Sequence, residues 1–322
     1  MTDFSQVQQL TVGSEEDGQR LDNYLSRVLK RAPKALVYRI IRRGEVRVNG
    51  GRAKPGSRLK SGDRVRIPPV KINTAGPAPV PPAVIAGLDS CIIFEDRHYL
   101  VLNKAPGLAV HGGSGLSWGL IDAVRQWRPG SFLELVHRLD RGTSGCLILA
   151  RSREALLEAG RWFAEGKVVK SYRALLQGRL AEPRVTCSAG LERVTAGDGR
   201  REVRVSDAGK AARSHFYRLC ETDGITLARV EIETGRTHQI RAHAASLGAP
   251  LLGDSKYGAR PTPDLRQEWP LLHCYELRYT PGGLDARAPL SAAFITACDT
   301  LFGASRDGWR VWFEEHFSEA TT

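Results

Sequence analysis

The first 70 residues have apolar spacing that predicts two short helices followed by a small sheet. Leucine, tyrosine and valine recur at helical spacing over residues 20–30, and a second apolar-patterned segment runs from Pro33 to Gly44. A proline is tolerated in the first helical turn and a glycine is favoured just past the last one, so these two residues bound the second helix. Valines that alternate with charged residues then predict short strands, which turn at Asn49-Gly50 and close with GDRVRIP.

Strand patterns dominate beyond residue 88. Apolar runs predict strands in the segments SCIIFED, YLVLNK, LELVHRL, GCLILA, YRALLQG, SHFYRLCE and ITLARVEIE. The last two are joined by a turn that contains Asp223-Gly224, which predicts a hairpin. Helical spacing recurs over residues 152–166 and 237–248, and we expect Thr237 to cap the second helix and Gly248 to end it. Many strands and few long helices predict an α+β domain on a mixed, mainly antiparallel sheet.

A proline-rich segment separates these two patterns. Residues 71–87 (KINTAGPAPVPPAVIAG) have little polar side-chain content for a helix or a sheet, so we expect an extended linker with polyproline character. The division predicts a small α+β domain over residues 18–70 and a larger domain over 88–300. Residues 301–322 remain as a C-terminal tail, and from Pro289 onward we expect a packed helix and a frayed end.

The distribution of charge points to a polyanionic partner. The 322 residues contain 47 Lys and Arg against 35 Asp and Glu, a formal net charge of +12. Residues 27–66 alone contain 14 Lys and Arg against two acids, which matches the excess of the whole chain. A folded face of one sign repels itself, so nucleic acid is favoured over a merely solvated face. A membrane is a weaker option, because the helix lacks exposed large aromatics on its apolar side.

Other sequence features argue against a membrane or secreted protein. No apolar run approaches the roughly 18 residues that span a bilayer. The first ten residues lack the basic and apolar regions of a secretory signal. The six cysteines are scattered and form no CxxC pair, which is typical of reduced thiols rather than of a disulfide framework or a zinc ribbon. We therefore expect a cytoplasmic protein with no membrane partner.

Residues 137–145 (HRLDRGTSG) place one carboxylate, Asp140, between Arg138 and Arg141 on a turn between apolar runs. Two interpretations are open: a salt-bridged turn, or a nucleophile whose charge its neighbours control. A glycosidase would need a second carboxylate across the scissile bond, and none stands in a comparable setting. A serine triad would need a GxSxG elbow, which GTSG is not.

Other candidate residues have no distinctive function when each is taken alone. A metal site would need clustered histidines, but His238 and His243 are five residues apart on the predicted helix and so point about 140° apart. Arg236 stands between a predicted strand and that helix, where functional side chains emerge, although a surface ion pair is the ordinary explanation. Tyr172 lies among apolar residues of a predicted strand, as a core tyrosine would.

Together these segments resemble a known family. HRLDRGTSG, KSYRALLQG and EIETGRTHQIRAH, in this order and spacing, are similar to motifs of the RluA family of pseudouridine synthases. VLNKAPGLAVH and LLHCYEL, which contains His273, are similar to two further segments, so the resemblance covers about residues 20–295. The chain departs from the family pattern at Ala105, where a proline is usual, and at Cys274, where an alanine is usual. Residues 18–68 resemble an S4 RNA-binding domain.

The resemblance implies that a uridine in RNA is flipped out of its stack and isomerised, so that the N1–C1′ bond breaks and a C5–C1′ bond forms. Asp140 would be the essential nucleophile or the base that starts a glycal route. Arg236 would be its ion-pair partner, because a nearby cation offsets the effect of burial on a carboxyl pKa. Tyr172 would stack on the detached uracil, and Arg138 and Arg141 would hold RNA phosphate. No redox change occurs, so no cofactor and no metal are implied.

The S4-like segment carries implications for the substrate. It would contact structured RNA mainly through phosphates and shape, with the basic residues Lys34, Arg39, Arg42, Arg43, Arg47 and Arg52. These features favour 23S ribosomal RNA, which the enzyme would meet during large-subunit assembly. We expect a monomer. A related synthase that acts on transfer RNA, and a non-catalytic RNA-binding assembly factor, stay open as alternatives.

Overall fold

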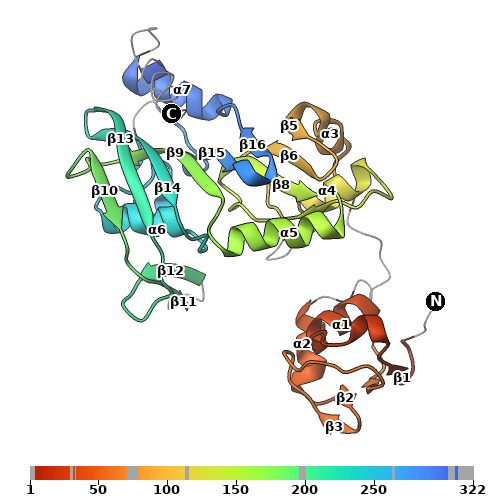
Figure 1. The fold of residues 1–322 in the computed structure, drawn as a ribbon. Coiled ribbons are helices and arrows are strands. Elements are labelled where there is room, and N and C mark those ends of the chain that lie inside the picture. Colours follow the sequence, from red (N-terminus) through yellow and green to blue (C-terminus); the bar gives the residue numbers. More distant parts are fainter. Residues whose placement is uncertain are drawn as a thin grey trace. The chain divides into compact units, whose positions relative to one another are not determined.

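A computed structural model describes residues 4–29, 32, 34–70, 79–112, 116–195, 201–262, 265–303 and 309–310, apart from the side chains of residues 34, 35 and 201. The chain divides into two compact units, residues 1–78 and 79–322 (Figure 1). Within this described part, no helix combines the length and the apolar character that crossing a membrane requires.

The N-terminal unit is a four-stranded sheet, in the order β1-β4-β2-β3, with two helices. Its elements are β1 Gln8–Thr11, α1 Leu21–Val28, α2 Lys34–Arg42, β2 Arg47–Val48, β3 Gly51–Arg52 and β4 Arg64–Ile67, with a 3₁₀ turn at Ser14–Glu16. Leu21, Leu25 and Ile41 are among the apolar side chains that form its core. Both predicted helices are confirmed, and Asn49 and Gly50 have φ of +49° and +80°, as the predicted tight turn requires.

This unit begins earlier than residue 18, the predicted start. β1 pairs with β4 in antiparallel register, from Gln8 opposite Ile67 to Thr11 opposite Arg64. The strand was not predicted because four residues, QQLT, contain a single large apolar side chain and show no periodicity on their own. Its backbone hydrogen bonds with β4, which no sequence pattern reports, place it in the sheet.

The predicted linker is wrong for its second half, and its first half, residues 71–78, lies outside the described residues. Pro82–Ala86 form helix α3. Proline in the first turn removes an N–H that would have no helical partner, so the proline pair does not prevent a helix here. Val80 is buried, and Val84 and Ile85 pack against the core of the C-terminal unit. Burial of these apolar side chains therefore overrides the polyproline tendency of the composition.

The C-terminal unit is built on a ten-stranded sheet with the order β10-β13-β14-β9-β15-β8-β6-β5, in which β16 also pairs with β15 and β7 with β8. Its strands are β5 Ile92–Glu95, β6 Tyr99–Lys104, β7 Glu134–Leu135, β8 Ser144–Ala150, β9 Val169–Gln177, β10 Arg184–Cys187, β13 Ser214–Thr222, β14 Ile225–Ile232, β15 Leu272–Tyr279 and β16 Leu284–Arg287. A separate hairpin joins β11 Leu191–Thr195 to β12 Arg201–Val205. Pairing is antiparallel except between β15 and β8, which confirms the predicted fold class.

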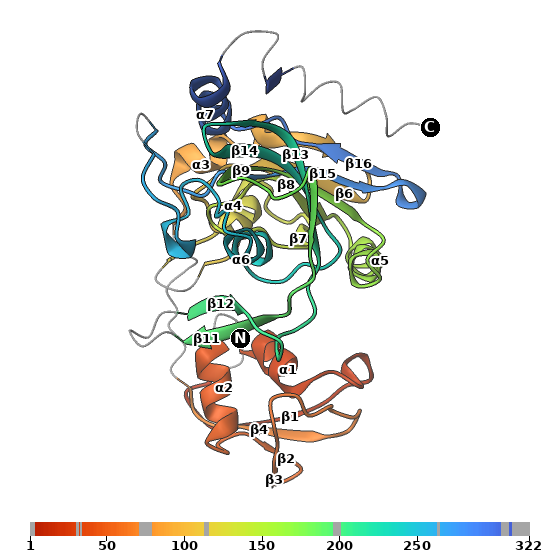
Figure 2. The ribbon, with the colours of Figure 1, turned by 90° about the vertical axis from the view of Figure 1, so that its left-hand side faces the viewer.

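Helices cover both faces of this sheet. They are α3, α4 Leu120–Trp127, α5 Arg153–Ala164, α6 Gln239–Ser246 and α7 Ala292–Phe302, with 3₁₀ turns at Asp89–Cys91, Ser255–Tyr257 and Thr280–Gly282. Figure 2 shows α6 and α7 on opposite faces. The predicted 237–248 helix is confirmed in its inward residues Ile240 and Ala244 and in its end at Gly248, which has a φ of +73°. α7 passes residue 300, the predicted domain end, and residues 311–322 of the predicted tail lie outside the described residues.

Small and polar residues lie at the parallel pairing of β8 with β15. Gly145 has a φ of +105°, and a Cβ at this position would overlap the carbonyl oxygen of Cys274. The Ser144 hydroxyl lies 2.8 Å from His273 Nδ1, and His273 Nε2 lies 3.1 Å from the carbonyl oxygen of Ala288. A carbonyl only accepts, so Nε2 carries the proton and Nδ1 accepts from Ser144. Burial lowers the His273 pKa to about 4, which keeps the ring neutral.

We expect Gly145→Ala to lower the free energy of unfolding by more than about 3 kcal/mol, because the new methyl group combines overpacking with an unfavourable φ. Chemical denaturation of the full chain measures this change. The matched control is Gly160→Ala in α5, where nothing lies within 4 Å of the added Cβ. That exposed helical change should raise stability by about 0.5–1 kcal/mol. Equal effects of the two changes would contradict the close approach of β15 to Gly145.

Candidate active site

Asp140 lies in the loop between β7 and β8. The predicted strand over LELVHRL is shorter than expected, because β7 ends at Leu135 and the chain then crosses as a loop to Ser144. The amide of Thr143 donates to the carbonyl oxygen of Asp140 at 3.1 Å, and the Asp140 side chain is 19% exposed. The predicted position of this acid, at a turn between two paired strands, is confirmed.

Lys104, at the end of β6, holds this loop from inside. The residue is 2% exposed, and its ammonium donates to the carbonyl oxygens of Ala105 (2.9 Å), Leu108 (2.9 Å) and Arg141 (3.2 Å). Burial lowers the Lys104 pKa to about 7, and the negative charge of Asp140 opposes that shift. Three carbonyl acceptors match the three donors of an ammonium, which favours the charged form. Lys104 thus places a buried positive charge near Asp140.

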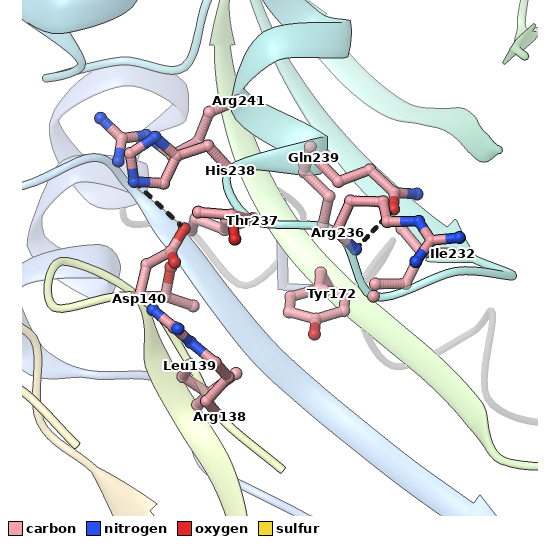
Figure 3. A pocket seen from close by; sticks show the side chains of 14 residues that line it. Arg138, Leu139, Asp140, Tyr172, Ile232, Arg236, Thr237, His238, Gln239 and Arg241 are labelled. Carbon is pink, nitrogen blue, oxygen red and sulfur yellow. Dashed lines mark hydrogen bonds and ion pairs between the residues drawn. The ribbon is translucent and has the colours of Figure 1, made fainter. Parts of the chain in front are cut away.

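Tyr172 lines the same cleft as Asp140 (Figure 3). It lies on β9, opposite Val230 of β14 and Cys274 of β15, and is 8% exposed. Burial raises the Tyr172 pKa well above its ordinary value, so the phenol is neutral. Because side chains alternate along a strand, Tyr172 faces the side of the sheet that α6 covers, together with Val230.

The turn from β14 into α6 differs from the prediction. α6 begins at Gln239, so His238, and not Thr237, precedes the first helical turn, with a left-handed backbone at φ +52° and ψ +22°. The side-chain oxygen of Gln239 accepts from the Arg236 amide at 3.1 Å and from the Thr234 hydroxyl at 2.7 Å. The Gln239 side chain therefore replaces the expected threonine cap in satisfying the donors of this turn.

The expected ion pair between Arg236 and Asp140 is not formed in the structure. Arg236 Nε donates to the carbonyl oxygen of Ala211 at 3.2 Å, and Figure 3 shows its guanidinium directed away from Asp140. The positive charge that reaches Asp140 from α6 belongs instead to Arg241. The tight turn at Gln239 sends the Arg236 side chain outward and that of Arg241, five residues later, to the Asp140 side.

Arg241 is held by a bidentate ion pair with Asp254. Its Nε and Nη2 lie 2.6 Å and 2.7 Å from the two carboxylate oxygens, and the two side chains are only 12% and 1% exposed. Burial alone would lower the Arg241 pKa, but the hydrogen bonds and charge of Asp254, with a contribution from Asp140, raise it. Neither residue was predicted from the sequence, since only the fold brings Asp254 back to α6.

His238 presents a neutral N–H towards Asp140. The Tyr257 hydroxyl lies 2.9 Å from His238 Nδ1 and accepts from the Val203 amide at 3.3 Å. The phenol therefore donates its proton to Nδ1, and Nε2 carries the imidazole proton. Nε2 lies 3.9 Å from Asp140 Oδ2. Burial lowers the His238 pKa to about 4, and the cations Arg241 and Lys256 add to this effect while Asp140 and Asp254 oppose it.

These side chains surround one small cleft. Its volume is about 80 Å³, and its lining includes four of the predicted site residues, Arg138, Asp140, Tyr172 and Arg236. Arg141 is not part of this lining: its Nε donates to the carbonyl oxygen of Gly107 at 2.9 Å, and its guanidinium lies 4.8 Å from the ring centroid of Trp269. Among the described residues, no group of three or more His, Cys, Asp or Glu could hold a metal ion.

The predicted RNA-contact arginines of the N-terminal unit lie on α2 and on its sheet. Arg39, Arg42 and Arg43 are exposed on or next to α2, and the side chain of Lys34 lies outside the described residues. Strand register then places Arg47 directly opposite both Arg52 and Arg66, which forms a row of three arginines across β3, β2 and β4. We call this the arginine row. Its third member, Arg66, was not among the predicted contacts.

Comparison with known proteins agrees with this architecture. The RNA pseudouridylate synthase family model matches residues 98–246, and the S4 domain model matches residues 19–65. Among curated proteins, ribosomal large subunit pseudouridine synthase C of Haemophilus influenzae is 44% identical over 282 residues, which cover 85% of this chain and 88% of that protein. The protein of the same name from Pasteurella multocida is 41% identical over 308 residues, or 94% of each chain. The chain therefore belongs to the RNA pseudouridylate synthase family, and it is a pseudouridine synthase.

Solved structures show the same fold. Human RNA pseudouridylate synthase domain containing 1 aligns with a TM-score of 0.57 and 26% identity over 72% of this chain and 94% of that one. Human RNA pseudouridylate synthase domain containing 4 aligns with the same TM-score and 23% identity over 66% of this chain and 93% of that one. Both likenesses support the fold class.

We expect Tyr257→Phe to raise the His238 pKa above its value of about 4, because the lost hydroxyl no longer donates to Nδ1 and that nitrogen can then take a proton. An NMR pH titration of the His238 ring in the RNA-free protein measures the shift. Activity should fall more at pH 6 than at pH 8, since a cationic ring would pair with Asp140. Tyr217→Phe, on β13, is the control. An unchanged His238 titration would show that Tyr257 does not select the tautomer.

Proposed function

We propose that this chain isomerises uridine to pseudouridine in 23S ribosomal RNA, with Asp140 as the essential acid. One observation carries the proposal: a partly exposed carboxylate lies in a cleft lined by the neutral phenol of Tyr172, with the charges of two buried cations, Lys104 and Arg241, acting on it. A fixed positive charge stabilises a carboxylate more strongly in a partly buried cleft than in bulk water. The open side of the cleft leaves Asp140 accessible to a substrate.

The groups of the cleft suit a reaction at C1′ of a flipped nucleotide. The target uridine leaves its stack and enters the cleft, where the Asp140 carboxylate either attacks C1′ or removes a ribose proton to open a glycal route. The N1–C1′ bond breaks and the uracil leaves as an anion that turns. C5 then bonds to C1′ as the ester bond from C1′ to Asp140 breaks or, on the glycal route, as the ribose carbon takes its proton back from Asp140. C5 finally loses its proton and N1 gains one. The ring of Tyr172 supplies a flat apolar surface for the detached base. The neutral N–H of His238 can donate to Asp140 without adding a competing charge.

Ribosomal RNA is the substrate that the relatives and the domain composition favour. The curated relatives that match 85% and 94% of this chain are named for the large ribosomal subunit. The S4-like unit adds a second RNA-binding surface that a small hairpin substrate would not need. Arg138 and Arg236 line the cleft, so we expect them to hold phosphates near the target uridine. Arg141 follows Asp140 in the chain, and we expect it to hold phosphate outside this lining.

We also propose a time and a place for the reaction, and an oligomeric state for the enzyme. A uridine must be flipped out, which is easier before ribosomal proteins and tertiary contacts enclose it, so we place the reaction during large-subunit assembly. Ribosomal RNA is met in the cytoplasm. The residues named in the cleft lining all belong to the C-terminal unit, and we propose a monomeric enzyme.

The arginine row supports RNA binding by the N-terminal unit. Like charges directly opposite on neighbouring strands repel, so the row costs stability in the free protein. Phosphates would remove that repulsion and release counterions when RNA binds. Arg52 also packs against Gly44, at the end of α2, which links the row to the exposed arginines of that helix. The unit therefore presents a continuous set of phosphate contacts on β3 and the end of α2.

We expect Asp140→Asn to reduce pseudouridine formation by at least about 10⁴-fold, as loss of a covalent or general-base group does. Single-nucleotide pseudouridine mapping of 23S ribosomal RNA measures it in a strain without this protein, complemented with wild type or variant. Asp207→Asn, on an exposed loop, is the control and should restore the sites. Sites that return with Asp140→Asn would refute the role of this acid, and sites that never depended on the protein would refute the 23S target.

We expect Arg47→Gln to weaken RNA binding and to reduce the slope of log affinity against log salt by about 1, while the free energy of unfolding stays constant or rises. Filter binding over a salt series and chemical denaturation measure the two effects. Arg27→Gln is the comparison, because Arg27 forms a 2.6 Å ion pair with Glu16 and its loss should slightly lower stability. A marked destabilisation by Arg47→Gln would show that the row is structural.

A further inference from the structure

A groove lies beside the Asp140 cleft and shares a wall with it. We call it the β11–α6 groove, and its lining includes the basic residues Arg193, Lys210 and Arg236. Its volume is about 420 Å³, compared with about 80 Å³ for the cleft. Residues 235–237 line both spaces, so a chain that leaves the cleft across this segment enters the groove.

The groove is a built part of the fold. Its floor consists of Leu191 and Val203, which are 5% and 6% exposed and pack with Ala242 of α6. The backbone of Lys210 exchanges two 2.9 Å hydrogen bonds with Leu191 of β11. A Cβ at Gly209 would overlap the backbone of Leu191, so this segment approaches β11 as closely as the chain permits. The groove floor therefore packs on the same helix that carries the active-site cation Arg241.

The charge of the groove is predominantly positive. Three cations face one acid, Glu192, in its lining. Among the described residues, no carboxylate lies within 4 Å of the charged nitrogens of Lys210, Arg193 or Arg236. Arg193 donates to the Thr237 hydroxyl and Arg236 to a carbonyl oxygen, and each guanidinium has further donors beyond these. Cations held by neutral partners keep their charge available for an anion.

A flipped uridine stays covalently joined to both of its neighbours. The RNA strand must therefore leave the small cleft at an edge, and the edge formed by residues 235–237 opens into a basic groove with an apolar floor. Arg236 stands on this shared edge with its guanidinium turned away from Asp140, where the phosphate that links the uridine to its neighbour would pass. A phosphate at this position would explain why Arg236, which lines the cleft, forms no ion pair with Asp140.

We propose that the β11–α6 groove binds the RNA nucleotides directly adjoining the target uridine, with Arg193, Lys210 and Arg236 on their phosphates and the apolar floor under a base. The inference rests on the proposed function, since it assigns the path of that RNA. It gives Arg236 a phosphate in place of Asp140 as its partner, and it makes the β11–β12 hairpin part of substrate recognition.

Lys210 is the most suitable residue for a test, because it lines the groove but not the cleft. The substrate is the shortest ribosomal RNA transcript that wild-type protein isomerises at a mapped uridine. We expect Lys210→Gln to raise KM about 3- to 10-fold, with a smaller effect on kcat, and to reduce the salt slope of binding by about 0.7–0.9. Lys210→Arg should restore both. Arg161→Gln, on the exposed surface of α5, is the control for loss of one positive charge.

Replacing single phosphates of the RNA by neutral methylphosphonates locates the phosphate that Lys210 contacts. Transcripts that carry one methylphosphonate, placed in turn at each position around the target, are compared between wild type and Lys210→Gln. We expect the KM penalty of one or two phosphates next to the uridine to disappear in the variant, because the contact is already lost. The inference would be overturned if the KM penalties of Lys210→Gln and of the methylphosphonate simply added at every adjoining phosphate. It would also be overturned if the two penalties were non-additive only at distant phosphates. A wild type that isomerises no ribosomal transcript would instead overturn the proposed function.

Discussion

The buried ammonium of Lys104 is the contact on which the active site depends most. It bonds the carbonyl oxygens of two separate loops, one after β6 and one after Asp140. β6 also pairs with β8, and Gly145 of β8 abuts the backbone of Cys274 on β15. The Asp140 loop is thus held by the Lys104 ammonium and by the pairing of β8 with β6 and β15. The exposed Arg141 adds a hydrogen bond to the carbonyl oxygen of Gly107. One cation both positions the loop and sets the charge around the acid.

Features with a local cause could be predicted from the sequence. Asp223 and Gly224 have φ of +41° and +75°, so the predicted hairpin needs residues that tolerate positive φ, and their identity reveals the turn. Ser152 caps α5 by accepting from the amide of Ala155, and that helix lies where the apolar spacing places it. The nine consecutive letters of HRLDRGTSG were enough to place Asp140 at a turn between two strands. They left both a salt-bridged turn and a nucleophile open, and only the resemblance of several segments together favoured the nucleophile.

Features with a tertiary cause could not be predicted. Arg236 and Arg241 stand five residues apart in one motif, and nothing in the letters shows which of them faces Asp140. The outcome depends on a left-handed residue, His238, and on Asp254, which the fold returns to α6. Helix α3 in the proline-rich segment and strand β1 also have a tertiary cause. Their residues become ordered by packing or pairing with partners far away in the sequence.

The two units use positive charge in different ways. In the catalytic unit, Arg241 is matched by Asp254 and Lys104 by three carbonyl oxygens, so these buried charges are fixed before any substrate arrives. In the N-terminal unit, Arg47 lies opposite two other arginines, and a bound anion would neutralise their charge. Exposed, unmatched charge gives affinity that salt weakens, whereas buried, matched charge is screened little. We therefore expect ionic strength to weaken RNA binding more than it changes the electrostatic environment of Asp140.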